Sequence, residues 1–174
     1  AAELEVLLRN REESTFATKI LSLDKLMELL SRWRSQGEKV VFTNGCFDLL
    51  HVGHVTYLDR ARQYGDRLIL GLNTDRSVRL LKGPERPLVG EMDRARVLAS
   101  LASVDAVILF DEETPLALIE AVQPDYLAKG ADYREEEVVG SDRVKSWGGE
   151  VILVPLVSGK STSGLMAGIK ERSE

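Results

Sequence analysis

The sequence holds only two histidines, and both fall in one short segment between a predicted strand and a predicted helix. The segment runs from Thr43 to His54 and reads T-N-G-C-F-D-L-L-H-V-G-H. Because His51 and His54 are three residues apart at a helix start, their rings can point the same way, and Gly53 leaves room between them. Free backbone N–H groups and the positive end of the helix dipole lie at the same place. The pattern predicts a phosphate pocket in which imidazole donors follow negative charge as it moves to a leaving group.

Competing interpretations exist for these residues. Two unrelated surface histidines would leave Gly53 and the position after the first predicted strand unexplained. Asp48 can contact nucleotide hydroxyls or help place a metal, although an aspartate in a turn before a helix often only caps backbone donors. Cys46 is interpreted as a packing residue, because no second cysteine or orienting histidine pattern supports a nucleophile there.

Two later segments carry groups that suit phosphates and sugars. Lys82 and Arg86 lie in a Gly/Pro-rich loop after the second predicted strand, where composition alone would make them ordinary solvated charges. Gly130 follows the fourth predicted strand and allows a ligand to approach the backbone, while Asp132 offers a carboxylate to sugar hydroxyls. A simple turn explains Gly130 and Asp132 equally well.

A third segment follows the fifth predicted strand and contains Ser161, Thr162 and Ser163. Hydroxyls and free N–H groups at the helix start predicted there can hold phosphate, or they can merely form an N-cap. The letters G-K-S in this segment do not make a P-loop, because that motif needs a glycine where Val154 stands. The glycine fingerprint of nicotinamide dehydrogenases and a metal-ligand cluster are both absent from the sequence, so we expect Mg²⁺ to arrive with a nucleotide.

Length and composition set the class of protein. A chain of 174 residues with 44% apolar and 29% charged residues predicts one globular core. The net charge of -5 gives no reason to expect a nucleic-acid partner, and no apolar stretch reaches the roughly 20 residues that span a bilayer. One cysteine and a start without a signal peptide suggest a reducing cytoplasm. The oligomeric state is open, and a homo-oligomer is compatible with the sequence.

Short apolar runs alternate with helical patterns along the chain, as in a parallel sheet with crossover helices. Predicted strands lie near residues 40–42, 68–72, 106–110, 126–128 and 151–154, and predicted helices near 23–33, 54–64, 91–101, 115–122, 138–147 and 162–171. The predicted fold is a Rossmann-like, doubly wound five-stranded α/β domain over residues 22–174, with helices on both faces and a covering helix capped by Ser22. Residues 1–21 are interpreted as a polar lead-in. In such a sheet, ligands bind beyond the carboxyl ends of the strands, near the point where strand order reverses.

The signature ending in H-V-G-H resembles that of the cytidylyltransferase-like nucleotidylyltransferase superfamily, whose HxGH element grips a triphosphate. The likeness extends from about Ser22 to the end of the chain, and it includes the late Ser/Thr-rich motif. It implies catalytic roles for His51, His54 and Lys82. It further implies nucleotide contacts by Thr43, Asn44, Gly45, Phe47, Asp48, Gly53, Gly130, Ser161, Thr162 and Ser163, and substrate contacts by Arg86 and Asp132.

Within the superfamily, the segments L-K-G-P-E-R-P, K-G-A-D-Y and G-K-S-T-S resemble those of the heptose 1-phosphate adenylyltransferase family. That family makes ADP-heptose from ATP and D-glycero-β-D-manno-heptose 1-phosphate for lipopolysaccharide, and it occurs alone or fused behind a sugar kinase that acts upstream. A chain near this length would be the stand-alone type. Relatives that use CTP commonly carry Arg-Thr before the late motif, where this chain has Leu156 and Val157. This difference weakens the glycerol-3-phosphate cytidylyltransferase alternative, and a non-catalytic nucleotide-binding module is the other alternative.

The expected reaction is an in-line attack by the phosphate oxygen of the acceptor on the α-phosphorus, with no covalent enzyme intermediate. The attacking oxygen is already anionic near neutral pH, so no general base is needed. A bound phosphate favours protonated imidazole, whereas the helix start disfavours it. The sequence leaves the protonation state of the histidines open.

Overall fold

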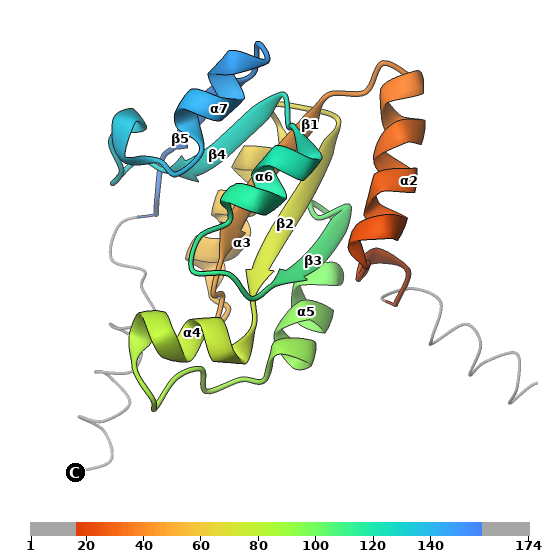
Figure 1. Ribbon diagram of the computed structural model, residues 1–174. Helices are drawn as coiled ribbons and strands as arrows, with labels where there is room; N and C mark the ends of the chain where they lie inside the picture. The colour runs from red at the N-terminus through yellow and green to blue at the C-terminus, as the bar shows by residue number, and fades with distance from the viewer. Residues whose placement is uncertain (1–16, 158–174) are drawn as a thin grey trace, which may run out of the picture.

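The computed structural model describes residues 17–157, which form one sheet with helices around it (Figure 1). The strands are β1 (Val40–Gly45), β2 (Arg67–Asn73), β3 (Ala106–Phe110), β4 (Tyr126–Gly130) and β5 (Glu150–Val154). The helices are α2 (Leu23–Ser35), α3 (Val52–Arg62), α4 (Asp75–Lys82), α5 (Glu91–Ala99), α6 (Leu116–Val122) and α7 (Ser141–Ser146), with the 3₁₀ turns η1 (Ala17–Lys19) and η2 (Glu135–Glu137). No helix in this described part is long and apolar enough to cross a membrane.

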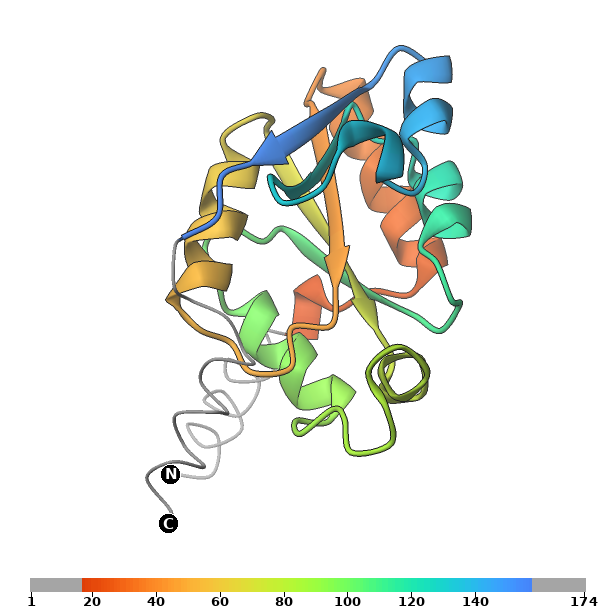
Figure 2. The same ribbon diagram turned by 90° about the vertical axis from the view of Figure 1, so that its left-hand side faces the viewer.

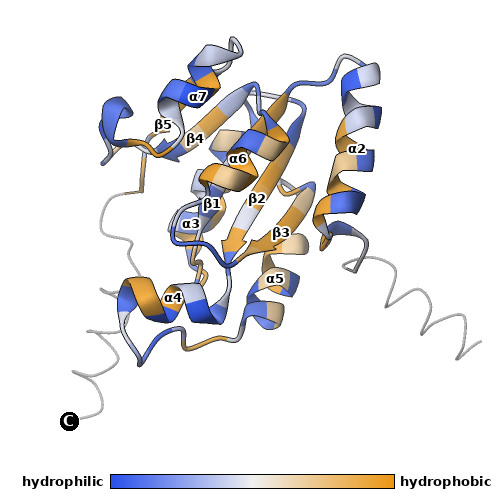
Figure 3. Cartoon of the chain, viewed as in Figure 1, coloured by the Kyte–Doolittle hydropathy of each residue, from blue (hydrophilic) through white to orange (hydrophobic). Residues whose placement is uncertain are grey.

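The five strands are all parallel and lie in the order β3-β2-β1-β4-β5. This order confirms the predicted doubly wound α/β sheet, with the reversal of strand order between β1 and β4. Helices α3 and α5 cover one face, while α2, α6 and α7 cover the other (Figure 2). Apolar residues dominate the central strands and the inner sides of the helices (Figure 3).

Each face of the sheet has its own core, because side chains of a strand alternate between the two sides. Phe42 on β1 belongs to the core under α2 and α6, and its neighbour Val41 belongs to the core under α3 and α5. Both side chains are fully buried. Helix α2 begins after Ser22, whose side chain accepts a hydrogen bond from the backbone N–H of Lys25, as predicted for its N-cap.

The ladder between β1 and β4 is much shorter than the ladder between β1 and β2. Strand β1 is in register with β2 over six residue pairs, from Val40 to Gly45. Its register with β4 covers only two pairs, at Val41 and Phe42. Beyond Phe42 the two central strands continue without ladder pairing, at the position where ligands bind in doubly wound sheets.

Three segments differ from the prediction or lie beyond the described residues. Helix α4 replaces part of the predicted loop after β2. Thr74 caps it by accepting from Ser77 N, and Ser77 and Val78 are its buried residues, so little of the helix packs on the core. At the start of the domain, Leu21 N donates to Val107 O of β3 at 2.9 Å, so ordered structure begins before residue 22. The helix predicted at 162–171 lies outside the described residues.

Candidate active site

A pocket of about 440 Å³ opens at the carboxyl ends of β1 and β4 and at the start of α3. The end of β1 contributes Asn44 and Gly45, and the end of β4 contributes Lys129 and Gly130. Both histidines, together with Gly53 between them, line it from α3. The pocket therefore lies where the strand order reverses, as expected for a ligand site in this fold.

The two histidines stack against each other and also cap helix α3. Their ring centroids are 3.9 Å apart, with an angle of 28° between the ring planes. His51 Nδ1 accepts from Gly53 N at 3.1 Å, and His54 Nδ1 accepts from His51 N at 3.4 Å. Because both Nδ1 atoms act as acceptors, a neutral ring carries its proton on Nε2. Burial, reinforced by the neighbouring His51, lowers the pKa of His54 to about 4, so His54 is neutral near pH 7.

The turn after β1 shapes the wall beside the histidines. Phe47 has a φ of 45°, and its ring centroid is 5.2 Å from that of His54. A Cβ on Gly45 would lie 2.8 Å from the Phe47 ring, so a side chain at residue 45 would displace the ring. Cys46 also lines the pocket and is only partly buried. Burial raises the pKa of its thiol, which argues against a reactive thiolate.

Two lysines line the pocket. Lys82, the last residue of α4, is exposed and was predicted as a site residue. Lys129 was not predicted, although the sequence places it at the end of a strand beside Gly130. It is partly buried and donates a hydrogen bond to Asn44 Oδ1, and burial lowers its pKa to about 8. A charged residue at the carboxyl end of a central strand was the signal that could have identified it.

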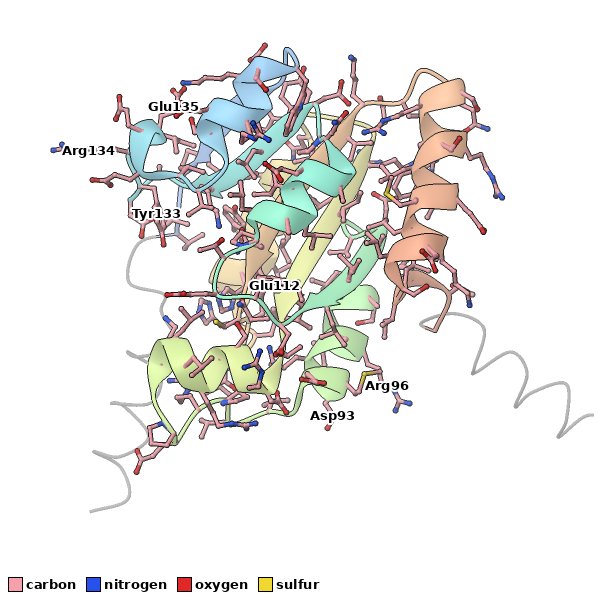
Figure 4. All side chains as sticks on the ribbon, in the orientation of Figure 1. Asp93, Arg96, Glu112, Tyr133, Arg134 and Glu135 are labelled. Atoms are coloured by element: carbon pink, nitrogen blue, oxygen red, sulfur yellow. The ribbon has the colours of Figure 1, made fainter. Side chains whose placement is uncertain are left out.

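Asp132 and Tyr133 line the pocket from the loop after β4, and Figure 4 shows Tyr133 projecting from this loop. Gly130 keeps that wall open, because a Cβ there would lie 2.5 Å from Asp132 Oδ1 and 3.1 Å from the side chain of Leu156. Leu156 and Val157 complete the described lining on this side. Ser161, Thr162 and Ser163 lie outside the described residues.

Replacing Gly130 with alanine is expected to push Asp132 out of its position, because the added methyl group would overlap its carboxylate. We expect a rise in the substrate KM of roughly 10-fold, since small displacements of positioning groups cost one to two orders of magnitude. Gly90→Ala is the matched control, because the nearest atom to its Cβ would be 3.8 Å away. Equal KM values for the two variants in a steady-state assay would contradict a positioning role for Gly130.

Three predicted site residues are used elsewhere in the structure. Thr43 is fully buried on the α3 side of β1, where its Oγ1 lies 2.8 Å from Tyr57 Oη and donates to Ala128 O at 3.1 Å. Asp48 and Arg86 form an ion pair at 2.5 Å and do not line the pocket. None of these three side chains is among the described residues that line the pocket.

The Asp48 carboxylate also accepts from Leu88 N at 2.8 Å and from Val89 N at 3.0 Å. Burial by itself would raise the pKa of Asp48. The two backbone hydrogen bonds and the bond from Arg86 outweigh this effect and hold the pKa of Asp48 below its usual range. Asp48 therefore fastens the loop between α4 and α5 to the turn after β1.

Known proteins resemble this chain in sequence and in fold. The family model described as cytidylyltransferase-like matches residues 42–162. The chain is 61% identical to the bifunctional protein HldE of Methylobacillus flagellatus over 95% of its own length and 34% of that protein, and 65% identical to HldE of Magnetococcus marinus over 85% and 30%. It thus spans about a third of the length of these relatives.

Among solved structures, the lipopolysaccharide core biosynthesis protein of Thermoplasma volcanium is similar, with a TM-score of 0.59 and 28% identity over 71% of this chain and all of that one. Pantothenate synthetase of Thermus thermophilus shares the fold, with a TM-score of 0.57 and 21% identity over 80% of this chain and 62% of that one. The family match covers most of the described domain and includes the stacked histidines. The chain therefore belongs to the cytidylyltransferase-like family and is a nucleotidyltransferase.

Proposed function

We propose that this chain transfers the adenylyl group of ATP to D-glycero-β-D-manno-heptose 1-phosphate, giving ADP-heptose and pyrophosphate. The observation that carries the proposal is the stacked histidine pair in a lysine-containing pocket at the switch point of the sheet. The heptose acceptor rests on the resemblance of the K-G-A-D-Y and neighbouring segments, and on relatives that bear the name HldE. Because the chain covers about a third of those relatives, their second activity is not assigned to it.

The reaction needs positioned donors more than it needs bases or nucleophiles. A phosphate oxygen of the acceptor forms a bond to the α-phosphorus while the bond from that phosphorus to the pyrophosphate oxygen breaks. In this proposal, the imidazoles of His51 and His54 accept backbone N–H groups at Nδ1 and serve as Nε2–H donors to the reacting and departing phosphate oxygens. Lys82 adds positive charge from the opposite element, α4, and Gly53 allows close approach at the helix start.

The neutral state of His54 suits this role. A neutral imidazole with its proton on Nε2 is a hydrogen-bond donor. The positive end of the helix dipole disfavours a protonated imidazole but does not disfavour this neutral form. Negative charge that develops on the leaving pyrophosphate raises the pKa of a neighbouring imidazole. The hydrogen bond therefore strengthens as the reaction proceeds, which is the differential binding that catalysis requires.

We propose that Mg²⁺ enters with the nucleotide. Mg²⁺ in such sites is held by substrate phosphates and one or two carboxylates, and Asp132 is a carboxylate that lines the pocket. When bound, Mg²⁺ would neutralise negative charge on the phosphates.

We also propose that Ser161, Thr162 and Ser163 bind the β- and γ-phosphates. We further propose that a sugar kinase acts before this enzyme and supplies the acceptor. Both reactions would take place in the cytoplasm, where ATP is available.

A second candidate is a cytidylyltransferase acting on glycerol 3-phosphate, which the family description favours. Leu156 and Val157 line the pocket where relatives that use CTP commonly carry Arg and Thr, and these apolar side chains cannot replace the hydrogen bonds of that pair. A binding module without catalysis is the third candidate. It would keep the pocket and release no pyrophosphate.

A pyrophosphate-release assay tests the proposal directly. ATP, CTP and GTP are each combined with heptose 1-phosphate and with glycerol 3-phosphate, in the presence of Mg²⁺. We expect the ATP and heptose 1-phosphate pair to give the highest kcat/KM. Preference for CTP with glycerol 3-phosphate would replace the proposal by the second candidate, and nucleotide binding without pyrophosphate from any pair would replace it by the third.

A further inference from the structure

Two lysines line the pocket in the described part of the chain, and Lys129 is the one that lies at the end of a strand. It stands on β4 beside Asn44 of β1, at the reversal point of the sheet. An ammonium group has three N–H donors, and within residues 17–157 its hydrogen bond goes to the neutral Asn44 amide oxygen. Two donors therefore remain for a ligand.

Two buried or half-buried arginines of this protein are paired with carboxylates, whereas the half-buried Lys19 donates to the backbone carbonyl oxygens of Leu101 and Val104. Arg94 binds Asp75 at 2.7 Å, and Arg86 binds Asp48 at 2.5 Å. Among the ion pairs of residues 17–157, none includes Lys129. Removing a cation from water without a counter-ion is unfavourable, and the lowering of its pKa to about 8 reflects that cost. Lys129 differs from Lys19 because it lines a pocket and its hydrogen bond within residues 17–157 goes to one neutral amide oxygen.

The ionisable groups around the pocket do not supply Lys129 with an anionic partner. They come from the turn after β1, from α3, from α4 and from the loop after β4, and they are Cys46, His51, His54, Tyr57, Lys82, Asp132 and Tyr133. The Cys46 thiol is uncharged at neutral pH, because burial raises its pKa. Asp132 is the acidic residue of this set; it is exposed, and the Lys129 ammonium group bonds Asn44 instead. Phosphate oxygens are the complementary ligand for such a compact ammonium group.

We propose that Lys129 binds a phosphate group of the substrates in this pocket, and that Asn44 holds its ammonium group in place. Lys129 is thereby a substrate-contacting residue, and Asn44 is a positioning residue. The inference builds on the proposed function, since that function brings a triphosphate and a sugar phosphate into the pocket. It concerns binding, so it is tested by binding and not by turnover.

The test compares Lys129→Met, Lys129→Arg and the control Lys25→Met, which alters an exposed lysine on α2. Calorimetric titrations use Mg·ATP in one arm and heptose 1-phosphate in the other. We expect about 10- to 100-fold weaker binding in Lys129→Met for the ligand whose phosphate it holds, because hydrogen bonds to charged groups contribute about 1.5–3 kcal/mol. Weakening in the first arm assigns the nucleotide phosphates, and weakening in the second assigns the acceptor phosphate.

Proton uptake separates a phosphate contact from a general packing effect. With a pKa of about 8 in the free pocket, Lys129 is about half protonated at pH 8, and a bound anion raises that pKa. Binding to the unmodified chain at this pH should therefore take up roughly half a proton, measured from binding heats in two buffers of different ionisation enthalpy. Lys129→Arg should bind with little proton uptake, because arginine is already charged, and Lys129→Met should show neither uptake nor tight binding.

The result that overturns the proposal is equal affinity and equal proton uptake in Lys129→Met, Lys25→Met and the unmodified chain. Failure of the proposed function has a different signature. If ATP binds with the Lys129-dependent proton uptake and no acceptor yields pyrophosphate, the phosphate contact holds and the assigned reaction is wrong.

Discussion

Replacing His54 with alanine is expected to lower kcat by roughly 10²- to 10³-fold while the protein stays folded. The variant removes a donor that contacts the reacting phosphates in the proposed mechanism, and it leaves the sheet and its two cores untouched. Loss of one such donor typically costs about 2.7–4 kcal/mol in the transition state. Steady-state kinetics of pyrophosphate release would measure the effect, with little change expected in the affinity for ATP.

His54 also accepts the backbone N–H of His51, so its loss weakens the cap of α3. Removing a helix cap costs about 0.5–2 kcal/mol of unfolding free energy. Ser22→Ala is the matched control, because Ser22 caps α2 far from the pocket. A similar loss of stability with normal turnover in Ser22→Ala would separate the cap from the chemistry. Near-normal turnover in His54→Ala would refute the assigned role.

Replacing Arg94 with methionine should destabilise the fold by about 3–5 kcal/mol, the usual cost of breaking a buried ion pair from one side. Arg94 is 2% exposed and binds Asp75 at 2.7 Å. It also donates to the carbonyl oxygens of Cys46 at 2.6 Å, Asn73 at 2.9 Å and Val89 at 2.8 Å. Methionine fills much of the volume but leaves these buried acceptors without donors. Urea denaturation should therefore show a much lower midpoint.

Arg96→Met is the matched control for this prediction. Arg96 lies two residues further along α5, and Figure 4 shows its side chain pointing away from the body of the protein. A surface substitution of this kind is expected to change the unfolding free energy by less than about 0.5 kcal/mol. Arg94→Lys should be intermediate, because lysine keeps the charge but lacks the planar fork that reaches several acceptors. Equal urea midpoints for Arg94→Met and Arg96→Met would contradict the account.

The sheet and the histidine pocket could be predicted because their signals are local in the sequence. Short apolar runs between helical patterns define the strands, and parallel strands bring their carboxyl ends to one edge. The spacing of His51, Gly53 and His54 then places both rings at a helix start. The structure adds that the rings stack at 3.9 Å and that each Nδ1 is an acceptor.

The direction of individual side chains could not be predicted, because it depends on register. Thr43 and Asn44 are neighbours on β1, so they point to opposite faces. Thr43 consequently bonds Tyr57 in the core, while Asn44 bonds Lys129 at the pocket. Asp48 and Arg86 are 38 residues apart, and nothing in the local pattern announces their pairing. Tertiary contacts of this kind decide which residues of a motif meet a ligand.

The short ladder between β1 and β4 leaves side chains, rather than the backbone, as the links across this part of the sheet. Backbone pairing ends at Phe42, and from there the two halves of the sheet are linked across the gap by side chains, through Thr43 to Ala128 O and through Lys129 to Asn44. Side chains change by point mutation, whereas a backbone ladder does not. A point substitution at one of these positions would therefore change the width or the charge of the opening without altering the backbone ladder.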